Sequence, residues 1–239
     1  ICQVGQRIDF FWTTIINESE LLEKFNVEIL PIDMVDFINQ VRIKLNKNKS
    51  KYKSEAKEIA KECIIESFQG LDPLMNILAV RDQMIEIAGT HNADGIAIQD
   101  FTSLVNAMDT YCFFANSMVS EKYPVGCETD IHGTISAIML SRLNFDLQPV
   151  FLVDVTVRHP DNDNGVLLWH AGAPLSMKHP DEKIKLGTHW ILPSPLGGMT
   201  HFRLKDGPIT VLRFDGDGGE YRIAAVSYTH LTLPTIYSV

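Results

Sequence analysis

Residues 124–143 constrain the fold more than any other stretch, because a short apolar run, two acids and a helical pattern follow one another directly. Residues 124–127 predict a buried strand, and the apolar residues of 135–143 recur at helical spacing. Glu128 and Asp130 therefore lie at a strand-to-helix junction. Ligands of open α/β sheets bind at such junctions, at the carboxyl ends of strands. We expect the site of this protein at the same place.

Asp130 has two interpretations, which do not exclude each other. Asp is a preferred N-cap, and capping is the simpler explanation of its place before the helix. The free N–H groups at a helix N-terminus also keep carboxylates ionised, and an ionised Asp flanked by Glu128 and His132 is suited to a divalent metal. His170 ends an apolar run and is the second candidate metal ligand, although a lone His at a strand end more often has a structural role.

The order of elements before residue 123 predicts a Rossmann-like parallel sheet with helices, hence an α/β fold. Apolar runs predict strands at 7–16, 27–31 and 95–99, and helical patterns occur at 33–45, 55–68, from Pro73 onward, and at 101–121 with a break near Asp109. The lysine-rich residues 46–53 favour a solvated linker over a phosphate-binding patch.

After residue 143 the pattern changes to short β-branched runs separated by turn residues. These runs, at 150–157, 165–170, 199–204, 209–214 and 221–225, predict a mostly antiparallel β region. We therefore divide the chain into a Rossmann-like domain at 1–123 and an incomplete β-rich catalytic domain at 124–225.

Both ends of the sequence predict that it is a fragment. Residues 226–235 are what a transposase sequencing adapter would encode, since GTC TCT TAT ACA CAT CTG ACG CTG CCG ACG translates to those ten residues. Residues 226–239 are therefore expected to be a non-native tail that packs poorly. The chain starts with Ile1 rather than Met, and we expect an upstream part to precede it.

Composition narrows the class of partner. The formal net charge of −9 argues against nucleic acid, because phosphate binding needs a basic face. No apolar run is long enough to span a bilayer, and no signal peptide opens the chain. The four cysteines form no CxxC pair, which favours neither a disulfide framework nor a zinc site and suits a cytoplasmic protein.

Four stretches together resemble the L-fucose isomerase and L-arabinose isomerase superfamily, in particular its divergent fucose-isomerase-like members. They are residues 9–25, 95–99, 124–133 and 168–172, and the Glu-x-Asp core at 128–130 is the most specific. The resemblance implies a metal-dependent aldose–ketose isomerase that acts on a pentose or 6-deoxyhexose through a cis-enediol. It also implies Mn²⁺, no organic cofactor, and a homo-oligomer, either trimer or hexamer.

The resemblance assigns roles to three residues. Asp130 is expected to bind the metal and transfer protons, Glu128 to share the acid–base role, and His170 to ligate the metal. The sequence departs from the superfamily near Cys112, where a partner Glu is missing, so that Asp109 or Glu128 would have to substitute. The final metal-binding His has no match, so the fragment is expected to be inactive alone.

Two other functions remain open. One is a non-catalytic sugar-binding member of the same fold, which would differ from an isomerase in having no need of a bound cation. The other is an unrelated α/β binding domain of periplasmic type, against which the absence of a signal peptide argues.

Overall fold

The computed structural model describes residues 1–144, 148–191 and 195–230. A parallel sheet in the order β2-β1-β4-β5 forms its centre. Its strands are β1 (Cys2–Val4), β2 (Leu30–Ile32), β4 (Ile96–Ile98) and β5 (Val125–Cys127). The parallel register pairs Cys2 with both Leu30 and Ile96. The predicted α/β fold with a parallel sheet is confirmed, and the carboxyl ends of all four strands meet at one edge.

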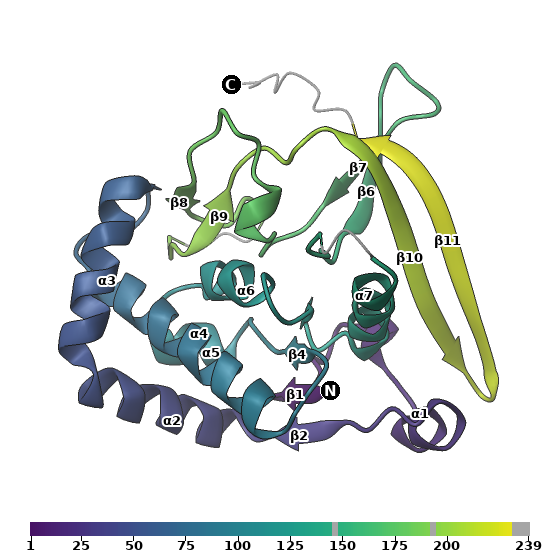
Figure 1. Cartoon of the computed structure of the whole chain (residues 1–239), viewed down its shortest axis with the longest axis horizontal. Coiled ribbons are helices and arrows are strands. Elements are labelled where there is room, and N and C mark those ends of the chain that lie inside the picture. Colours follow the sequence, from purple (N-terminus) through teal and green to yellow (C-terminus); the bar gives the residue numbers. More distant parts are fainter. Residues whose placement is uncertain (145–147, 192–194, 231–239) are drawn as a thin grey trace.

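Helices cover both faces of this sheet. They are α1 (Glu18–Phe25), α2 (Met34–Lys47), α3 (Lys49–Glu62), α4 (Asp72–Thr90), α5 (Ser103–Met108), α6 (Phe113–Val119) and α7 (Ile131–Leu143). Figure 1 shows α2, α4 and α5 on one side of the strands and α7 on the other. Alternation along β4 explains this arrangement, because Ile96 and Ile98 belong to the apolar cluster on the first side, whereas Ala97 packs with Ile131 of α7.

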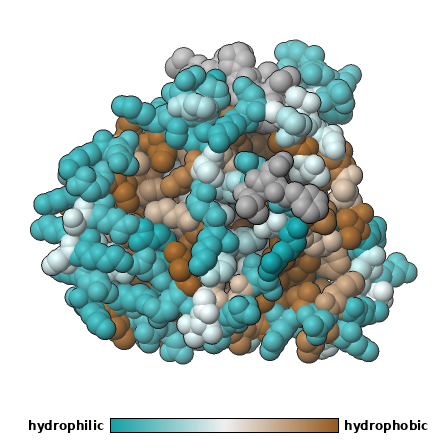
Figure 2. Space-filling model, in the orientation of Figure 1, coloured by the Kyte–Doolittle hydropathy of each residue, from teal (hydrophilic) through white to brown (hydrophobic). Residues whose placement is uncertain are grey.

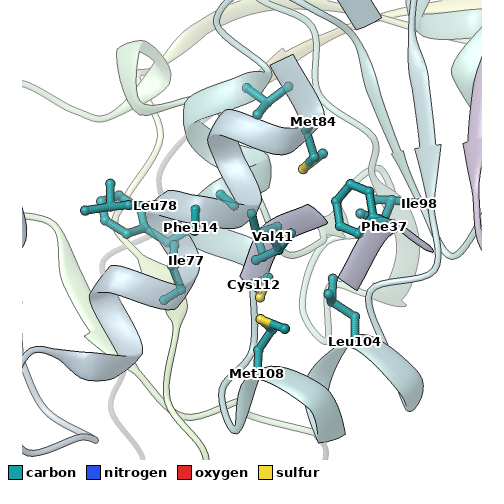
Figure 3. Packing of buried hydrophobic residues seen from close by; sticks show 14 of the residues in the cluster. Phe37, Val41, Ile77, Leu78, Met84, Ile98, Leu104, Met108, Cys112 and Phe114 are labelled. Carbon is teal, nitrogen blue, oxygen red and sulfur yellow. The ribbon is translucent and has the colours of Figure 1, made fainter. Parts of the chain in front are cut away.

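The larger apolar cluster lies between the sheet and helices α2, α4, α5 and α6. Figure 3 shows side chains that meet there, including Phe37, Ile77, Met108, Cys112 and Phe114. Cys112 has no exposed surface, and burial in apolar surroundings raises the pKa of its thiol. The position near which the sequence-based resemblance places a catalytic Glu is therefore part of the core.

Antiparallel pairs dominate the second half of the chain, as predicted. They are β6 (Asp154–Arg158) with β7 (Val166–Trp169), β8 (Lys185–Gly187) with β9 (Met199–His201), and β10 (Gly207–Asp217) with β11 (Glu220–His230). A short strand, β3 (Ile64–Ile65), pairs parallel with β8 and links the two halves of the chain. The 3-10 turns η1 (Trp12–Thr14) and η2 (Leu175–Met177) complete the elements of the described residues.

Two local predictions are wrong. Residues 7–16 form a loop with η1 rather than a strand, and Trp12 there is 73% exposed, because their aromatic composition mimics a buried strand. Residues 46–53 are not a linker: α2 runs to Lys47 and α3 begins at Lys49. Lysine is a good helix former, and the buried Tyr52 gives α3 an apolar side.

The predicted domain boundaries stay predictions. Residue 123 does not divide the sheet, because β5 follows it and is hydrogen-bonded to β4. Strand β11 crosses residue 226 and pairs with β10 as far as His230, while the side chains of Val226 and Tyr228 are 47% and 39% exposed. Residues 231–239 of the expected tail lie outside the described residues.

Hydrophilic residues cover broad areas of the surface. Figure 2 shows hydrophilic residues over most of the side of the molecule where α2 and α3 lie. Among the described residues, no helix has the length and apolar character that crossing a membrane requires.

Candidate active site

The direction in which successive strands are added to the parallel sheet reverses at β1. From β1 the chain goes to β2 on one side, and the later strands β4 and β5 add on the other side of β1. Such a reversal leaves a crevice outside the carboxyl ends, which is where open α/β sheets bind ligands. Acids follow both later strands there: Asp100 comes shortly after β4, and Glu128 directly after β5.

Glu128 lies in an unusual backbone turn. It and Thr129 both have left-handed conformations, with φ of 60° and 55°. This conformation costs a residue with a side chain about 1–2 kcal/mol. The turn is held by hydrogen bonds from the Thr129 amide to the Ile98 carbonyl (3.1 Å) and from the Asp130 amide to the Cys127 carbonyl (3.0 Å). Strain that the surrounding structure maintains in this way is typical of functional sites.

Asp130 is the N-cap of α7, as its sequence position predicts. Its Oδ1 accepts a hydrogen bond from the Gly133 amide at 2.8 Å, and its Oδ2 accepts one from Arg213 Nη1 at 2.5 Å. Arg213 also lies 3.5 Å from Asp215, whose other oxygen is 3.0 Å from Nδ1 of the buried His132. Both oxygens of Asp130 are thus engaged, and its expected roles in metal binding and proton transfer stay predictions.

Glu128 and His170 lie close together although 42 positions separate them in the sequence. The Sγ of Cys127, a carboxylate oxygen of Glu128 and a ring nitrogen of His170 all lie within 4.8 Å of one another. His170 follows β7, and its Nδ1 is 3.1 Å from the Ala171 carbonyl. The structure therefore brings two of the three sequence-predicted site residues into one cluster.

The surroundings of Glu128 favour its protonated form. Burial, followed by the negative charges of Asp100, Asp154 and Asp130, raises the pKa of Glu128 to about 8. Within the described part of the chain, no Lys or Arg forms an ion pair with Glu128 or Asp100. When burial and like charges hold the pKa of a carboxyl group near neutral pH, the group can act as either acid or base.

Asp100 lies behind Glu128 and was not predicted from the sequence. It is fully buried, and its Oδ1 accepts hydrogen bonds from the Cys127 thiol (3.0 Å) and the Glu128 amide (3.2 Å). Its Oδ2 accepts one from Asn116 Nδ2 at 2.7 Å. Burial raises the pKa of Asp100, and these donors oppose that rise. One sequence signal could have indicated it: an acid immediately after the predicted strand 95–99.

The chemistry of the donors determines whether a metal fits. A Glu oxygen and a His nitrogen are suitable ligands for a divalent cation such as Mn²⁺. Cys127 is less suitable, because its thiol donates to Asp100 and because burial, with the charges of Asp100 and Glu128, raises its pKa well above the usual value. Glu128 and His170 therefore fit a divalent cation, with Cys127 outside the ligand set.

No known protein-family model matches the chain. The sulfoquinovose isomerase of Alkalicoccus urumqiensis is 23% identical over 234 residues, which are 97% of this chain and 51% of that protein. Those of Priestia aryabhattai and Priestia megaterium are each 29% identical over 133 residues, which are 54% of this chain and 29% of each protein. This chain is similar to sulfoquinovose isomerases. It spans about half the length of the first of them.

These relatives overturn the resemblance drawn from the sequence. The matched curated proteins are named sulfoquinovose isomerases, so the identification as a fucose- or arabinose-isomerase relative is wrong. A strand followed by acids and a helix is a general way to build a site at a sheet edge, and such a motif does not distinguish among families that share it. The expectation of a pentose or 6-deoxyhexose substrate loses its support with the resemblance.

Aromatic side chains pack beside Cys127 of the acid cluster. His189 has only 8% of its surface exposed and lies among Phe101, Tyr111, Phe113 and Trp169, with ring centroids 5.7–6.3 Å from its own. Its Nδ1 accepts a hydrogen bond from the Ile191 amide at 3.1 Å. Burial and the nearby His170 and His201 lower the pKa of His189 to about 4, so it is neutral at pH 7.

The structure differs from the sequence-based predictions at two further acids, Asp109 and Asp154. Asp109, one of the two acids expected to replace the missing Glu, is an exposed residue at the end of α5 and is not in the Cys127–Glu128–His170 cluster. Asp154, the first residue of β6, was not predicted, yet its charge contributes to the raised pKa of Glu128. It lies within the predicted strand 150–157, where an acid in an alternating pattern resembles an ordinary solvent-facing residue.

Proposed function

We propose that this chain carries the acid–base site of an aldose–ketose sugar isomerase. One observation carries the proposal: Glu128 is held in a strained turn at the carboxyl edge of the sheet, beside His170, and neither Glu128 nor the neighbouring Asp100 forms an ion pair with a Lys or Arg of the described chain. The similarity to sulfoquinovose isomerases supports the same reaction class.

The reaction needs a group that takes a proton from carbon and returns it. In the open-chain aldose, a base removes the proton from C2 and leaves an enediol. Return of a proton to C1, with transfer of the hydroxyl proton from O2 to O1, gives the ketose. We propose that Glu128 transfers the carbon-bound proton between C2 and C1, because a carboxylate with a raised pKa is a stronger base than an ordinary Glu.

A divalent cation is part of the proposal. Glu128 and His170 are the residues that would hold it, and Mn²⁺ is our first candidate. When bound, such a cation acts as a Lewis acid on the carbonyl and hydroxyl oxygens of the sugar. The protein's own contribution is the half-buried position of Glu128 and His170 next to the aromatic cluster around His189, which would limit the access of water to the reacting carbons.

Sulfoquinovose is the first substrate to test, because the matched relatives are named for it. D-Glucose, which lacks the sulfo group, is the matched comparison sugar. Both should be assayed with the protein expressed from its complete natural reading frame, after EDTA treatment and after readdition of Mn²⁺. The homo-oligomer that the family resemblance implied remains a proposal, and light scattering on the same sample can check it.

Two variants identify the residues responsible. Glu128→Gln should lower isomerisation about 1,000-fold while the sugar still binds, and His170→Asn should raise the Mn²⁺ concentration needed for activity. Asp72→Asn, at an exposed position in the first turn of α4, is a matched control that should change neither. If the protein binds the sugar but converts none of it under any metal condition, it is a sugar-binding protein and the isomerase proposal is wrong.

A further inference from the structure

We propose that Asp100 is the positioning residue of this site: it fixes the left-handed turn that presents Glu128. The inference rests on the proposed function for its catalytic meaning, but its structural content does not depend on that function. It concerns a residue that does not touch solvent, since Asp100 has no exposed surface.

The hydrogen bonds of Asp100 connect three elements. Its Oδ1 binds two consecutive residues at the end of β5, through the Cys127 thiol and the Glu128 amide. Its Oδ2 binds Asn116 of α6, which prevents the carboxylate from rotating. Asp100 itself follows β4. The carboxylate therefore fixes the end of β5 relative to β4 and α6.

The Glu128 amide depends on this contact. The neighbouring amides of Thr129 and Asp130 donate to backbone carbonyls, whereas that of Glu128 donates to the side chain of Asp100. Without the carboxylate, a partly buried N–H would lack its acceptor in a turn that two successive left-handed residues already strain. The turn would then relax, and Glu128 would move away from His170.

This role requires an oxygen acceptor of the right shape, and it does not require a negative charge. An Asn at position 100 keeps an oxygen for Cys127 and Glu128, and its amide group would face Asn116. Asn116 can turn its own amide over to accept from it, because its Oδ1 has no hydrogen-bond partner among the described residues. A Val at position 100 has a similar shape but no acceptor.

Three variants in the full chain therefore form the test. Asp100→Asn should keep kcat within about fivefold of the parent. Asp100→Val should lower kcat at least about 30-fold with little change in KM. If the Val variant does not fold, Asp100→Ser takes its place, because the Ser side chain is too short for its oxygen to reach both donors. Whichever of these two variants is used is called the truncated variant below. Equal losses in the Asn and truncated variants would show that the charge acts directly and would overturn the proposal, as would full activity in a folded truncated variant.

A second measurement does not need activity. Hydrogen exchange of the Glu128 amide, followed by NMR on ¹⁵N-labelled protein, should be slow in the parent and in Asp100→Asn, and at least about tenfold faster in the truncated variant. The added change Thr129→Gly, which removes the cost of one left-handed residue, should restore part of the protection. If the parent isomerises no sugar but this exchange pattern holds, the proposed function fails and the positioning role stands. Unchanged exchange in the truncated variant overturns the positioning role.

Discussion

Two groups of acids in this molecule have opposite surroundings. At the carboxyl edge of the sheet, Asp100 is buried and Glu128 is half-buried near other acids, and the pKa of each is raised. Between α3 and α4, Glu55 and Asp82 share Arg81, and Lys51 also binds Asp82 at 2.9 Å. Burial acts to raise the pKa of Asp82, but its hydrogen bonds from Lys51 and Arg81 prevail and lower it.

The difference shows which acids stabilise the fold and which are available for chemistry. Arg81 donates to Asp82 through Nε at 2.9 Å and to Glu55 through both terminal nitrogens, so the helix acids have matched partners. At the sheet edge, Asp100 accepts hydrogen bonds from neutral groups, a thiol, an amide and a carboxamide, whereas Asp130 pairs with Arg213. A proton on Glu128 is therefore easily gained or lost near neutral pH, whereas Asp82 stays ionised.

The largest effect that would test this contrast comes from Glu128→Gln. We expect isomerase activity to fall about 1,000-fold, because the group that moves the proton is gone. Stability should change in the opposite direction. The folded pKa of Glu128, about 8, exceeds its usual value, so stability decreases as pH rises from about 4.5 to 8 and the full penalty remains above that.

Glu128→Gln should therefore stabilise the EDTA-treated protein at pH 9 by about 1–2 kcal/mol and leave it unchanged at pH 4. Urea unfolding at the two pH values measures this. A variant that is less stable than the parent at pH 9 would show that the acid is not destabilised in the folded state.

The next largest effect concerns the paired acids. Arg81→Met leaves Glu55 and Asp82 without their shared cation, and we expect a loss of about 2 kcal/mol in the free energy of unfolding, with kcat unchanged. The triple variant that adds Glu55→Gln and Asp82→Asn should recover most of the loss, because no acid is then left unpaired. If the triple variant is as unstable as the single one, packing of the Arg81 side chain and not its charge is responsible.

His189 tests the contrast from the side of the bases. Its folded pKa of about 4 lies below its usual value, because burial disfavours the charged imidazole. The unfolded chain therefore binds a proton that the folded protein does not, and stability is lost as pH falls from about 6.5 to 4, by roughly 1–3 kcal/mol. His189→Gln should flatten this part of the curve of unfolding free energy against pH. An unchanged slope would assign the effect to another group.

The smallest effect is expected for an exposed pair. Lys61 and Glu58 form an ion pair at 2.8 Å on α3, with side chains 69% and 63% exposed. Lys61→Ala should change the free energy of unfolding by less than about 0.5 kcal/mol, since water and salt screen such pairs. A loss comparable to that of Arg81→Met would remove the distinction between buried and exposed ion pairs in this protein.

The sequence was informative where local pattern and final burial agree. Strands β4 and β5 and helix α7 could be predicted because their apolar residues are buried in the fold, and Glu128 followed from its place after a strand. Residues 7–16 could not, because aromatic residues there are exposed while their composition is that of a strand. Asp100 could not be assigned a role either, because its partners Asn116 and Cys127 are distant in the sequence and only the fold brings them together.

Cys127 shows what the arrangement of the site means for its chemical durability. Thiols react with peroxides and alkylating agents as thiolates. Burial and the charge of Asp100 raise the pKa of the Cys127 thiol, which stays protonated and donates a hydrogen bond to Asp100. An acid that accepts this hydrogen bond therefore also makes the sulfur a poor nucleophile. The protein places a cysteine directly beside its candidate acid–base residue without making the site a target for oxidants.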